Sequence, residues 1–215
     1  DNRTPEPMLA VYRRAPASKP ISRTSMRTTA SSSWLKPRLM PAAEAAGDRD
    51  RAAVMYRDNG RRLVLALKHG DRMDLARPAS TWMLKAAAPV LQPGMLAVPV
   101  PLHWMRLFRR RFNQAALLSR AIARAAGLDH CPDALTRKRS TGSQEGKTRD
   151  ARFANLVGAF AVPVTREKRV AGRDILLVDD VMTSGATFAA ATEAIMAAGA
   201  RSVSVLSLAR VAKDG

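Results

Sequence analysis

One stretch, residues 174–187, constrains the fold of this chain more than any other. It opens with four apolar residues, 175–178, and runs directly into two adjacent carboxylates, Asp179 and Asp180. A short apolar run bounded by polar residues is typical of a strand buried in a parallel sheet. A Thr-Ser-Gly-Ala-Thr segment at 183–187 follows, and then an alanine-rich run with strong helix propensity. The order of strand, acidic tip, tight loop and helix predicts a ligand site beyond the carboxyl end of the strand.

The loop and the acidic pair together have the chemistry of a ribose 5-phosphate site. Free backbone N–H groups and the helix dipole favour an anion at a helix start, and Gly185 lets the backbone approach that anion or adopt a positive φ. Hydroxyl donors are added by Thr183, Ser184 and Thr187. Two adjacent carboxylates hold vicinal sugar hydroxyls, or water around a divalent cation. An ordinary buried strand with an acidic turn is the alternative, but two like charges at a strand tip repel each other.

This stretch closely resembles the signature of the type I phosphoribosyltransferases, which has four apolar residues, two acids and a Thr/Ser-Thr/Ser-Gly-x-Thr loop. The resemblance implies that Asp179 and Asp180 are catalytic residues that bind the ribose hydroxyls of phosphoribosyl pyrophosphate (PRPP) and hold Mg²⁺, mainly through water. It also implies a loop that wraps the 5-phosphate, made of Thr183, Ser184, Gly185, Ala186 and Thr187.

Candidate strands alternate with candidate helices along the chain, which predicts an α/β fold with a doubly wound, mainly parallel sheet of about five strands. Strands are expected at residues 95–100, 128–135, 158–162, 175–178 and 202–208. Helices are expected at 73–87 and 112–126, whereas residues 63–67 fit either a helix or a strand. Residues 136–155 are polar, basic and aperiodic, which predicts a long loop, and residues 163–172 are expected to form a charged connection.

The composition changes along the chain and suggests three parts. Residues 1–48 include a stretch rich in Ser, Thr, Ala, Pro and Arg, which predicts a disordered or degenerate segment. Residues 49–94 are expected to form a helical, hood-like segment, and residues 95–215 a phosphoribosyltransferase-like core. No apolar run approaches the ~20 residues that a membrane span needs, so we expect no membrane span and a cytoplasmic protein.

The charge of the chain is strongly positive, with a formal net charge of +18. Residues 101–173 carry 16 Lys and Arg against 5 Asp and Glu, so this third of the chain holds more than half of the surplus. Such a field attracts polyanions such as nucleic acid or pyrophosphate-bearing metabolites, although a compositional bias also produces it. The only cysteine, Cys131, excludes a disulfide within the chain and a Cys-based metal site.

A second motif follows the expected strand at 95–100. Prolines frame the strand tip and arginines follow it, which suits a pyrophosphate site because Arg binds phosphate oxygens bidentately; a turn before a basic helix is the alternative. This motif resembles the pattern VPVPL…R…RGFNQ of the ComF (competence protein F-like) branch of the superfamily. The matching positions are residues 98–102, Arg106 and residues 110–114, with Arg111 in place of the glycine. The resemblance implies a pyrophosphate site made of Val100, Pro101, Leu102, Arg106 and Arg110. It also implies that Arg106 is catalytic.

The resemblance to ComF extends to the basic segment at 136–155. It implies a mobile loop that closes over the site and carries Arg137, Gln144, Lys147 and Arg152. Closure of such a loop excludes water and brings cations to a departing pyrophosphate. A disordered basic linker is the alternative.

The sequence leaves the roles of two further residues, Lys68 and His103, open. Lys68 lies in a segment that matches the ComF pattern, and it either reaches a phosphate or caps a helix C-terminus; we favour the structural role. His103 lies beside the pyrophosphate motif and is a weak candidate for a proton carrier, since no acid lies near it in sequence.

Two functions are compatible with these motifs. The first is a phosphoribosyltransferase that uses PRPP and Mg²⁺, with an acceptor that the sequence leaves open. The alternative is a ComF-like accessory protein of DNA uptake in natural competence, which binds single-stranded DNA electrostatically and keeps the PRPP site as a regulatory or vestigial feature. ComF-like proteins commonly begin with a Cys-rich zinc-binding segment, and no cysteine precedes Cys131, so zinc is not expected. The oligomeric state is also left open.

Overall fold

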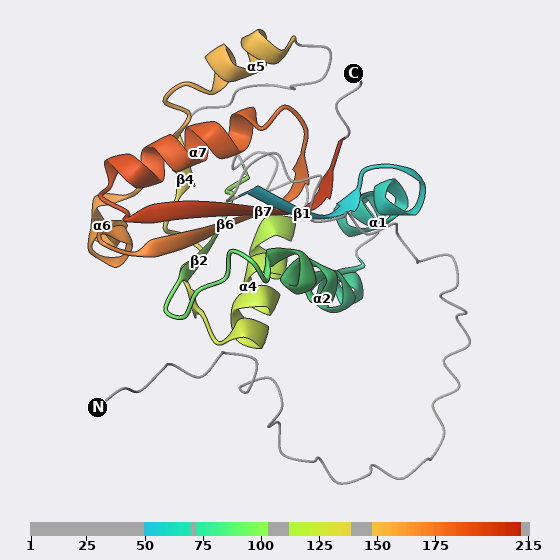
Figure 1. Ribbon diagram of the computed structural model, residues 1–215. Coiled ribbons are helices and arrows are strands. Elements are labelled where there is room, and N and C mark those ends of the chain that lie inside the picture. The colour runs from blue at the N-terminus through green and yellow to red at the C-terminus, as the bar shows by residue number, and fades with distance from the viewer. Residues whose placement is uncertain (1–49, 70–71, 103–111, 139–147, 212–215) are drawn as a thin grey trace, which may run out of the picture. The chain divides into compact units, whose positions relative to one another are not determined.

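The computed structural model describes residues 50–69, 72–102, 112–138 and 148–211, all within one compact unit, Ser33–Gly215. Its centre is a five-stranded sheet in the order β1-β7-β6-β2-β3, in which every neighbouring pair is parallel (Figure 1). The strands are β1 (Asp50–Met55), β2 (Leu96–Pro99), β3 (Asp129–His130), β6 (Asp174–Met182) and β7 (Ser202–Arg210). The expected doubly wound parallel sheet is confirmed, and β6 lies at its centre.

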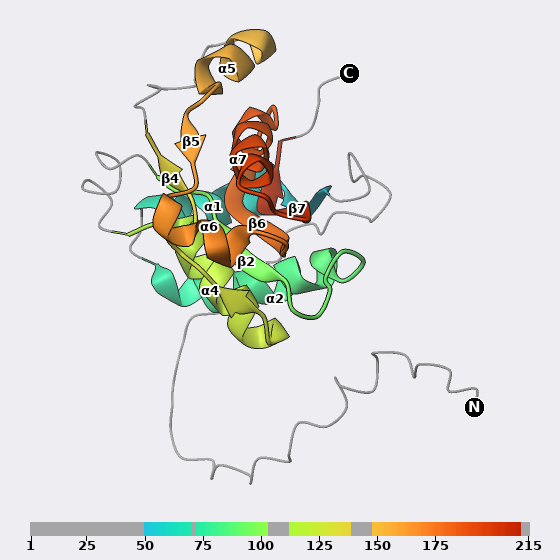
Figure 2. The same ribbon diagram turned by 90° about the vertical axis from the view of Figure 1, so that its left-hand side faces the viewer.

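Helices cover both faces of this sheet. One face packs against α1 (Asp58–His69), the 3₁₀ turn η4 (Met73–Leu75), α2 (Ala76–Ala87) and α4 (Gln114–Ala126). The other face packs against α5 (Arg149–Leu156), α6 (Val164–Val170) and α7 (Ala186–Ala197). Figures 1 and 2 agree that α7 lies on one side of the sheet and α2 and α4 on the other.

The apolar run of β6 explains why this strand is central. Leu176 and Val178 point into the core beneath α2 and α4, whereas Ile175 and Leu177 point into the core beneath α7. All four side chains are fully buried. A strand with helices on both faces needs this continuous apolar sequence rather than an alternating one.

Several expected elements are confirmed with small shifts in their bounds. The strand expected at 95–100 is β2, and the strand expected at 202–208 is β7. The helix expected at 73–87 corresponds to η4 followed by α2, and the helix expected at 112–126 is α4. Residues 63–67 lie in the helix α1. The sequence did not predict β1, which pairs with β7 from Asp50 to Met55.

Other expectations were correct only in part or were wrong. Only β3 forms within 128–135, and only β5 (Phe160–Ala161) within 158–162. β5 does not join the central sheet but pairs antiparallel with β4 (Thr136–Arg137). The expected long loop at 136–155 overlaps the helix α5, and the hydroxyl of Thr148 caps this helix by accepting from the backbone N–H of Ala151 at 3.3 Å. The charged connection at 163–172 contains the helix α6.

The segment 50–94 shares the sheet and the core with the residues that follow it. β1 pairs with β7, and the buried side chains of α1 and α2 belong to the same apolar cluster as Leu118 and Ile122 of α4. The expected disordered segment, residues 1–48, lies outside the described residues. Among the helices of the described ranges, none has the length and apolar character needed to cross a bilayer.

Candidate functional site

The candidate site lies at the carboxyl end of β6, where the strand continues through both acids before the chain turns into α7. Asp179 and Asp180 are therefore strand residues; β7 continues beside them, whereas the pairing of β2 with β6 ends at Val178. The backbone N–H of Asp180 donates to Oδ1 of Asp179 at 2.8 Å, which fixes the orientation of that carboxylate. The structure thus puts the acidic pair near the carboxyl end of the central strand, where parallel α/β sheets commonly bind ligands.

The two carboxylates have different electrostatic surroundings. Burial raises the pKa of Asp179 well above its usual range, and the charge of Asp180 raises it further. Asp180 forms an ion pair with Lys68, whose Nζ lies 3.3 Å from Oδ2. The Lys68 side chain is 22% exposed and that of Asp180 is 13% exposed, so water screens this pair less than it screens a surface pair.

The turn between β6 and α7 contains a glycine with a positive φ and leads directly into the helix. Gly185 has φ +82° and ψ −5°, and a Cβ built on it would meet nothing within 4 Å, so backbone conformation rather than space requires glycine here. Ser184 Oγ accepts from the backbone N–H of Ala186, the first residue of α7, at 3.4 Å. Thr183 is exposed and Thr187 half-buried. The predicted phosphate loop is thus followed directly by a helix N-terminus.

The tip of β2 lies beside the acidic pair. The register pairs Pro99 with Val178, and the backbone N–H of Val100 donates to the Val178 carbonyl at 2.8 Å. Pro101 and Leu102 follow and are half-buried. The structure therefore brings Val100 next to the strand that carries Asp179. The expected pyrophosphate ligands Arg106 and Arg110, together with His103, lie outside the described residues.

Two polar side chains at the start of α4 connect this tip to α1. Asn113 accepts from the backbone N–H of Ala115 at 3.0 Å, which caps α4, and its Nδ2 donates to the Val100 carbonyl at 3.1 Å. Gln114 is 1% exposed, and its Nε2 donates to the Leu67 carbonyl at 3.4 Å. Both residues belong to the motif at 110–114, and the sequence predicted no role for either; an Asn at a helix start is the signal that predicts a cap.

Little of the predicted mobile loop is described. Arg137 lies in β4, with its guanidinium over the ring of Phe160 at 5.4 Å from the centroid. Gln144 and Lys147 lie outside the described residues, and Arg152 belongs to α5.

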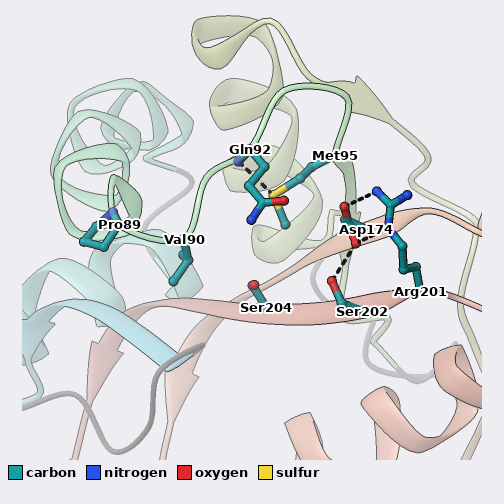
Figure 3. Close-up of a pocket in the computed structure, with 8 residues that line it drawn as sticks. All are labelled: Pro89, Val90, Gln92, Met95, Asp174, Arg201, Ser202 and Ser204. Atoms are coloured by element: carbon teal, nitrogen blue, oxygen red, sulfur yellow. Dashed lines mark hydrogen bonds and ion pairs between the residues drawn. The ribbon is translucent and has the colours of Figure 1, made fainter. Parts of the chain in front are cut away.

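A separate cavity of about 520 Å³ opens at the other edge of the sheet (Figure 3). Asp174 and Ser202, the first residues of β6 and β7, line it. Because these strands are parallel, the cavity lies at their amino ends, away from Asp179 and Asp180. Asp174 accepts hydrogen bonds from Arg201 and from Ser202 Oγ, the latter at 2.7 Å. This cavity is therefore distinct from the candidate site.

The donor set suits a hard divalent cation that keeps most of its water. Within the described ranges, no three His, Cys, Asp or Glu side chains gather closely enough to enclose a metal ion. Mg²⁺ prefers oxygen ligands and is commonly bound through one or two carboxylates together with water and substrate phosphates. Asp179 and Asp180 offer carboxylates of this kind at the strand tip.

Comparisons with known proteins identify a matching domain family and several similar proteins. Residues 113–214 match the phosphoribosyl transferase domain family. The chain is 33% identical over 153 residues to the DNA utilization protein YhgH of Escherichia coli (strain K12), covering 69% of this chain and 66% of that protein. It is 34% identical over 113 residues to Competence protein F of Haemophilus influenzae, covering 53% of this chain and 49% of that protein.

The chain therefore spans 66% of the length of the YhgH relative and about half of the competence protein. Among solved structures, the glutamine phosphoribosylpyrophosphate (PRPP) amidotransferase from B. subtilis, complexed with ADP and GMP, is similar with 14% identity and a TM-score of 0.44. That alignment covers 74% of this chain and 32% of that one.

Proposed function

The chain belongs to the ComF-like branch of the type I phosphoribosyltransferases, and on this premise we propose that it binds PRPP with Mg²⁺ and transfers the phosphoribosyl group to an acceptor. One observation carries the proposal: β6 carries two adjacent carboxylates near its carboxyl end, and a turn with Gly185 at φ +82° then leads into the N-terminus of α7. This arrangement combines acceptors for sugar hydroxyls with donors for a phosphate.

Each part of PRPP has a proposed partner. Asp179 and Asp180 accept hydrogen bonds from the ribose hydroxyls. The 5-phosphate lies against the backbone N–H groups and hydroxyls of Thr183, Ser184, Gly185, Ala186 and Thr187. The pyrophosphate lies at the tip of β2, beside Val100, Pro101 and Leu102, with Arg106 and Arg110 as cationic ligands from the segment that follows.

In the proposed reaction, the bond between ribose C1 and the pyrophosphate oxygen breaks and a bond from C1 to the acceptor forms. The pyrophosphate leaves with the electron pair, and positive charge develops at C1, near the carboxylates of Asp179 and Asp180. When bound, Mg²⁺ neutralises charge on the pyrophosphate and makes it a better leaving group. Arg106 stabilises the same leaving group. The segment with Gln144 and Lys147, which connects Arg137 in β4 to the helix that contains Arg152, closes over it and excludes water.

Pyrophosphate release is the direct test of this activity. We expect the wild type to release pyrophosphate from PRPP only with Mg²⁺ and a suitable acceptor, screened among nucleobases and amines. The double variant Asp179→Asn/Asp180→Asn is expected to be inactive. The control Asp133→Asn is expected to retain full activity, because Asp133 is far from β6 in sequence and its side chain is 56% exposed. If PRPP binds but no acceptor releases pyrophosphate, transfer is refuted and the binding function stands.

A role in handling DNA is the second proposal, and the named relatives favour it, because they are called a DNA utilization protein and a competence protein. A net charge of +18 suits binding to the phosphates of single-stranded DNA. Only 5% of the residues are aromatic, so we expect little base stacking and a steep loss of affinity with salt. An affinity that does not change with salt refutes electrostatic DNA binding.

Because charged PRPP does not cross a lipid bilayer unaided, we place the protein in the cytoplasm.

A further inference from the structure

Lys68 holds a position that capping a helix does not explain. Its ammonium lies 3.3 Å from Oδ2 of Asp180, one of the two carboxylates proposed to bind the ribose hydroxyls. The two residues are far apart in sequence, at the end of α1 and near the end of β6. The pair therefore brings a cation from another layer of the fold to the proposed ligand site.

Hydrogen bonds also tie the end of α1 to the tip of β2. The carbonyl of Leu67, directly before Lys68, accepts from Gln114 Nε2 at 3.4 Å. The adjacent Asn113 donates to the Val100 carbonyl at 3.1 Å, and the Val100 N–H donates to the Val178 carbonyl at 2.8 Å.

Together with the ion pair, these contacts close a ring. The ring runs from Lys68 through the start of α4 to Val100, on to β6 and back through Asp180. It holds Lys68 in a fixed relation to both the carboxylate pair and the loop proposed to bind pyrophosphate. Gln114 is buried, so water does not compete freely for the bond that anchors α1.

The chemistry of an ammonium group fits this place. An ammonium has three donors in different directions, and Asp180 faces only one side of it. Pyrophosphate is attached to ribose C1, so its oxygens lie close to the hydroxyls that Asp180 is proposed to bind. The Lys68 side chain is 22% exposed, which leaves part of it open to a ligand.

We propose that Lys68 is a ligand-contacting residue that binds the pyrophosphate of PRPP while Asp180 orients its ammonium. The inference rests on the proposed function, because it requires PRPP in this site. It adds a residue from α1 to a site otherwise built from β2, β6 and the loops that follow them. It also reverses the expectation from the sequence, which favoured a structural role for Lys68.

The test compares three probes, each with Mg²⁺, by titration calorimetry: PRPP, pyrophosphate and ribose 5-phosphate. Lys68→Met removes the charge at similar side-chain length, and we expect it to weaken PRPP and pyrophosphate about 10- to 100-fold, the loss typical of a charge-assisted hydrogen bond. Ribose 5-phosphate, which has no pyrophosphate, is expected to change less than about twofold. Lys68→Arg is expected to restore most of the affinity. Lys85→Met, at an exposed lysine of α2, is the control and leaves all three unchanged.

A second comparison separates direct contact from support of Asp180. In an Asp180→Asn background Lys68 has no carboxylate to compensate, so a further loss of pyrophosphate affinity on Lys68→Met demonstrates a direct contact. The inference is overturned if Lys68→Met causes no further loss of pyrophosphate affinity in this background. It is also overturned if the single variant Lys68→Met loses as much affinity for ribose 5-phosphate as for PRPP. If the wild type binds PRPP and the Lys68→Met variant binds it equally well, only the role of Lys68 is refuted. A wild type that binds no PRPP refutes the proposed function, and the inference with it.

Discussion

Asn113 Nδ2 lies 3.1 Å from the carbonyl oxygen of Val100, so the first turn of α4 holds the loop at the tip of β2. The same side chain caps α4 through its Oδ1. One residue therefore stabilises a helix and positions a loop proposed to bind pyrophosphate, and these two roles can be separated by substitution.

Asn113→Ala is expected to lower the free energy of unfolding by about 1 kcal/mol, the usual loss of a helix cap, and to weaken PRPP binding. Asn113→Ser retains a capping oxygen but is too short to donate to Val100 as Asn does. We therefore expect near wild-type stability and weakened PRPP binding for Asn113→Ser. Chemical unfolding and calorimetry measure the two effects, and unchanged PRPP affinity in both variants contradicts the role of this contact.

Gly185→Ala tests the phosphate loop against a matched glycine. Gly185 has φ +82° and Gly127, which ends α4, has φ +65°; a Cβ at either would meet nothing within 4 Å. Both substitutions to Ala are therefore expected to lower the free energy of unfolding by about 1 kcal/mol through backbone strain alone. Only Gly185→Ala is expected to weaken the binding of ribose 5-phosphate. Equal affinities in the two variants contradict the assignment of the loop.

Asp179→Asn tests the electrostatics of the acidic pair. The pKa of Asp179 is raised above 3.8, mainly by burial and next by Asp180. The stability that its neutral form contributes is complete below the unfolded pKa and is lost as pH rises through the folded pKa. Asn cannot ionise, so Asp179→Asn is expected to raise the free energy of unfolding near neutral pH and to leave it almost unchanged in acid.

Unfolding curves across pH, in buffer without Mg²⁺ or PRPP, measure this effect. The same variant is expected to bind PRPP more weakly, so stability and ligand binding change in opposite directions. A variant that is less stable than the wild type at every pH contradicts the assigned electrostatics.

Gly60→Ala tests the connection between β1 and α1, which places Lys68. A Cβ at Gly60 would lie 2.1 Å from the carbonyl oxygen of Met55, so the backbone must move. We expect a loss of about 1–3 kcal/mol in the free energy of unfolding, although Gly to Ala within a helix normally stabilises. Arg61→Ala, at the exposed neighbouring position, is the control and is expected to change it by less than about 0.5 kcal/mol. An unchanged Gly60→Ala variant contradicts the packing of this turn.

The sequence predicted the elements whose local pattern decides their structure. The apolar run of β6 ends in acids at a sheet edge, and this pattern alone indicated both the parallel sheet and the ligand end of the strand. β1 was not predicted, because it begins with Asp50 and Arg51 and is defined by pairing with β7, more than a hundred residues later. α5 was missed because its sequence lacks a clear apolar stripe, and the cap at Thr148 is a single residue.

The site shows the same division between local and long-range information. Residues 174–187 are contiguous, so the acids and the loop could be read from the sequence. The partner of Lys68 could not, because Asp180 approaches it only through the packing of α1 beside the sheet. The buried hydrogen bond of Gln114 depends on the same packing.

The most direct test of the account is an equilibrium titration of the wild type and of Asp179→Asn/Asp180→Asn with PRPP and Mg²⁺. The account predicts saturable binding by the wild type and a loss of roughly 100-fold or more in the double variant, since two charge-assisted contacts are removed. Asp133→Asn, at the exposed acid paired with Arg166, serves as the control for the loss of a carboxylate elsewhere on the protein and is expected to retain wild-type affinity. Absence of saturable binding by the wild type, or equal binding by the double variant, contradicts the assignment of residues 174–187 as a ribose-phosphate site.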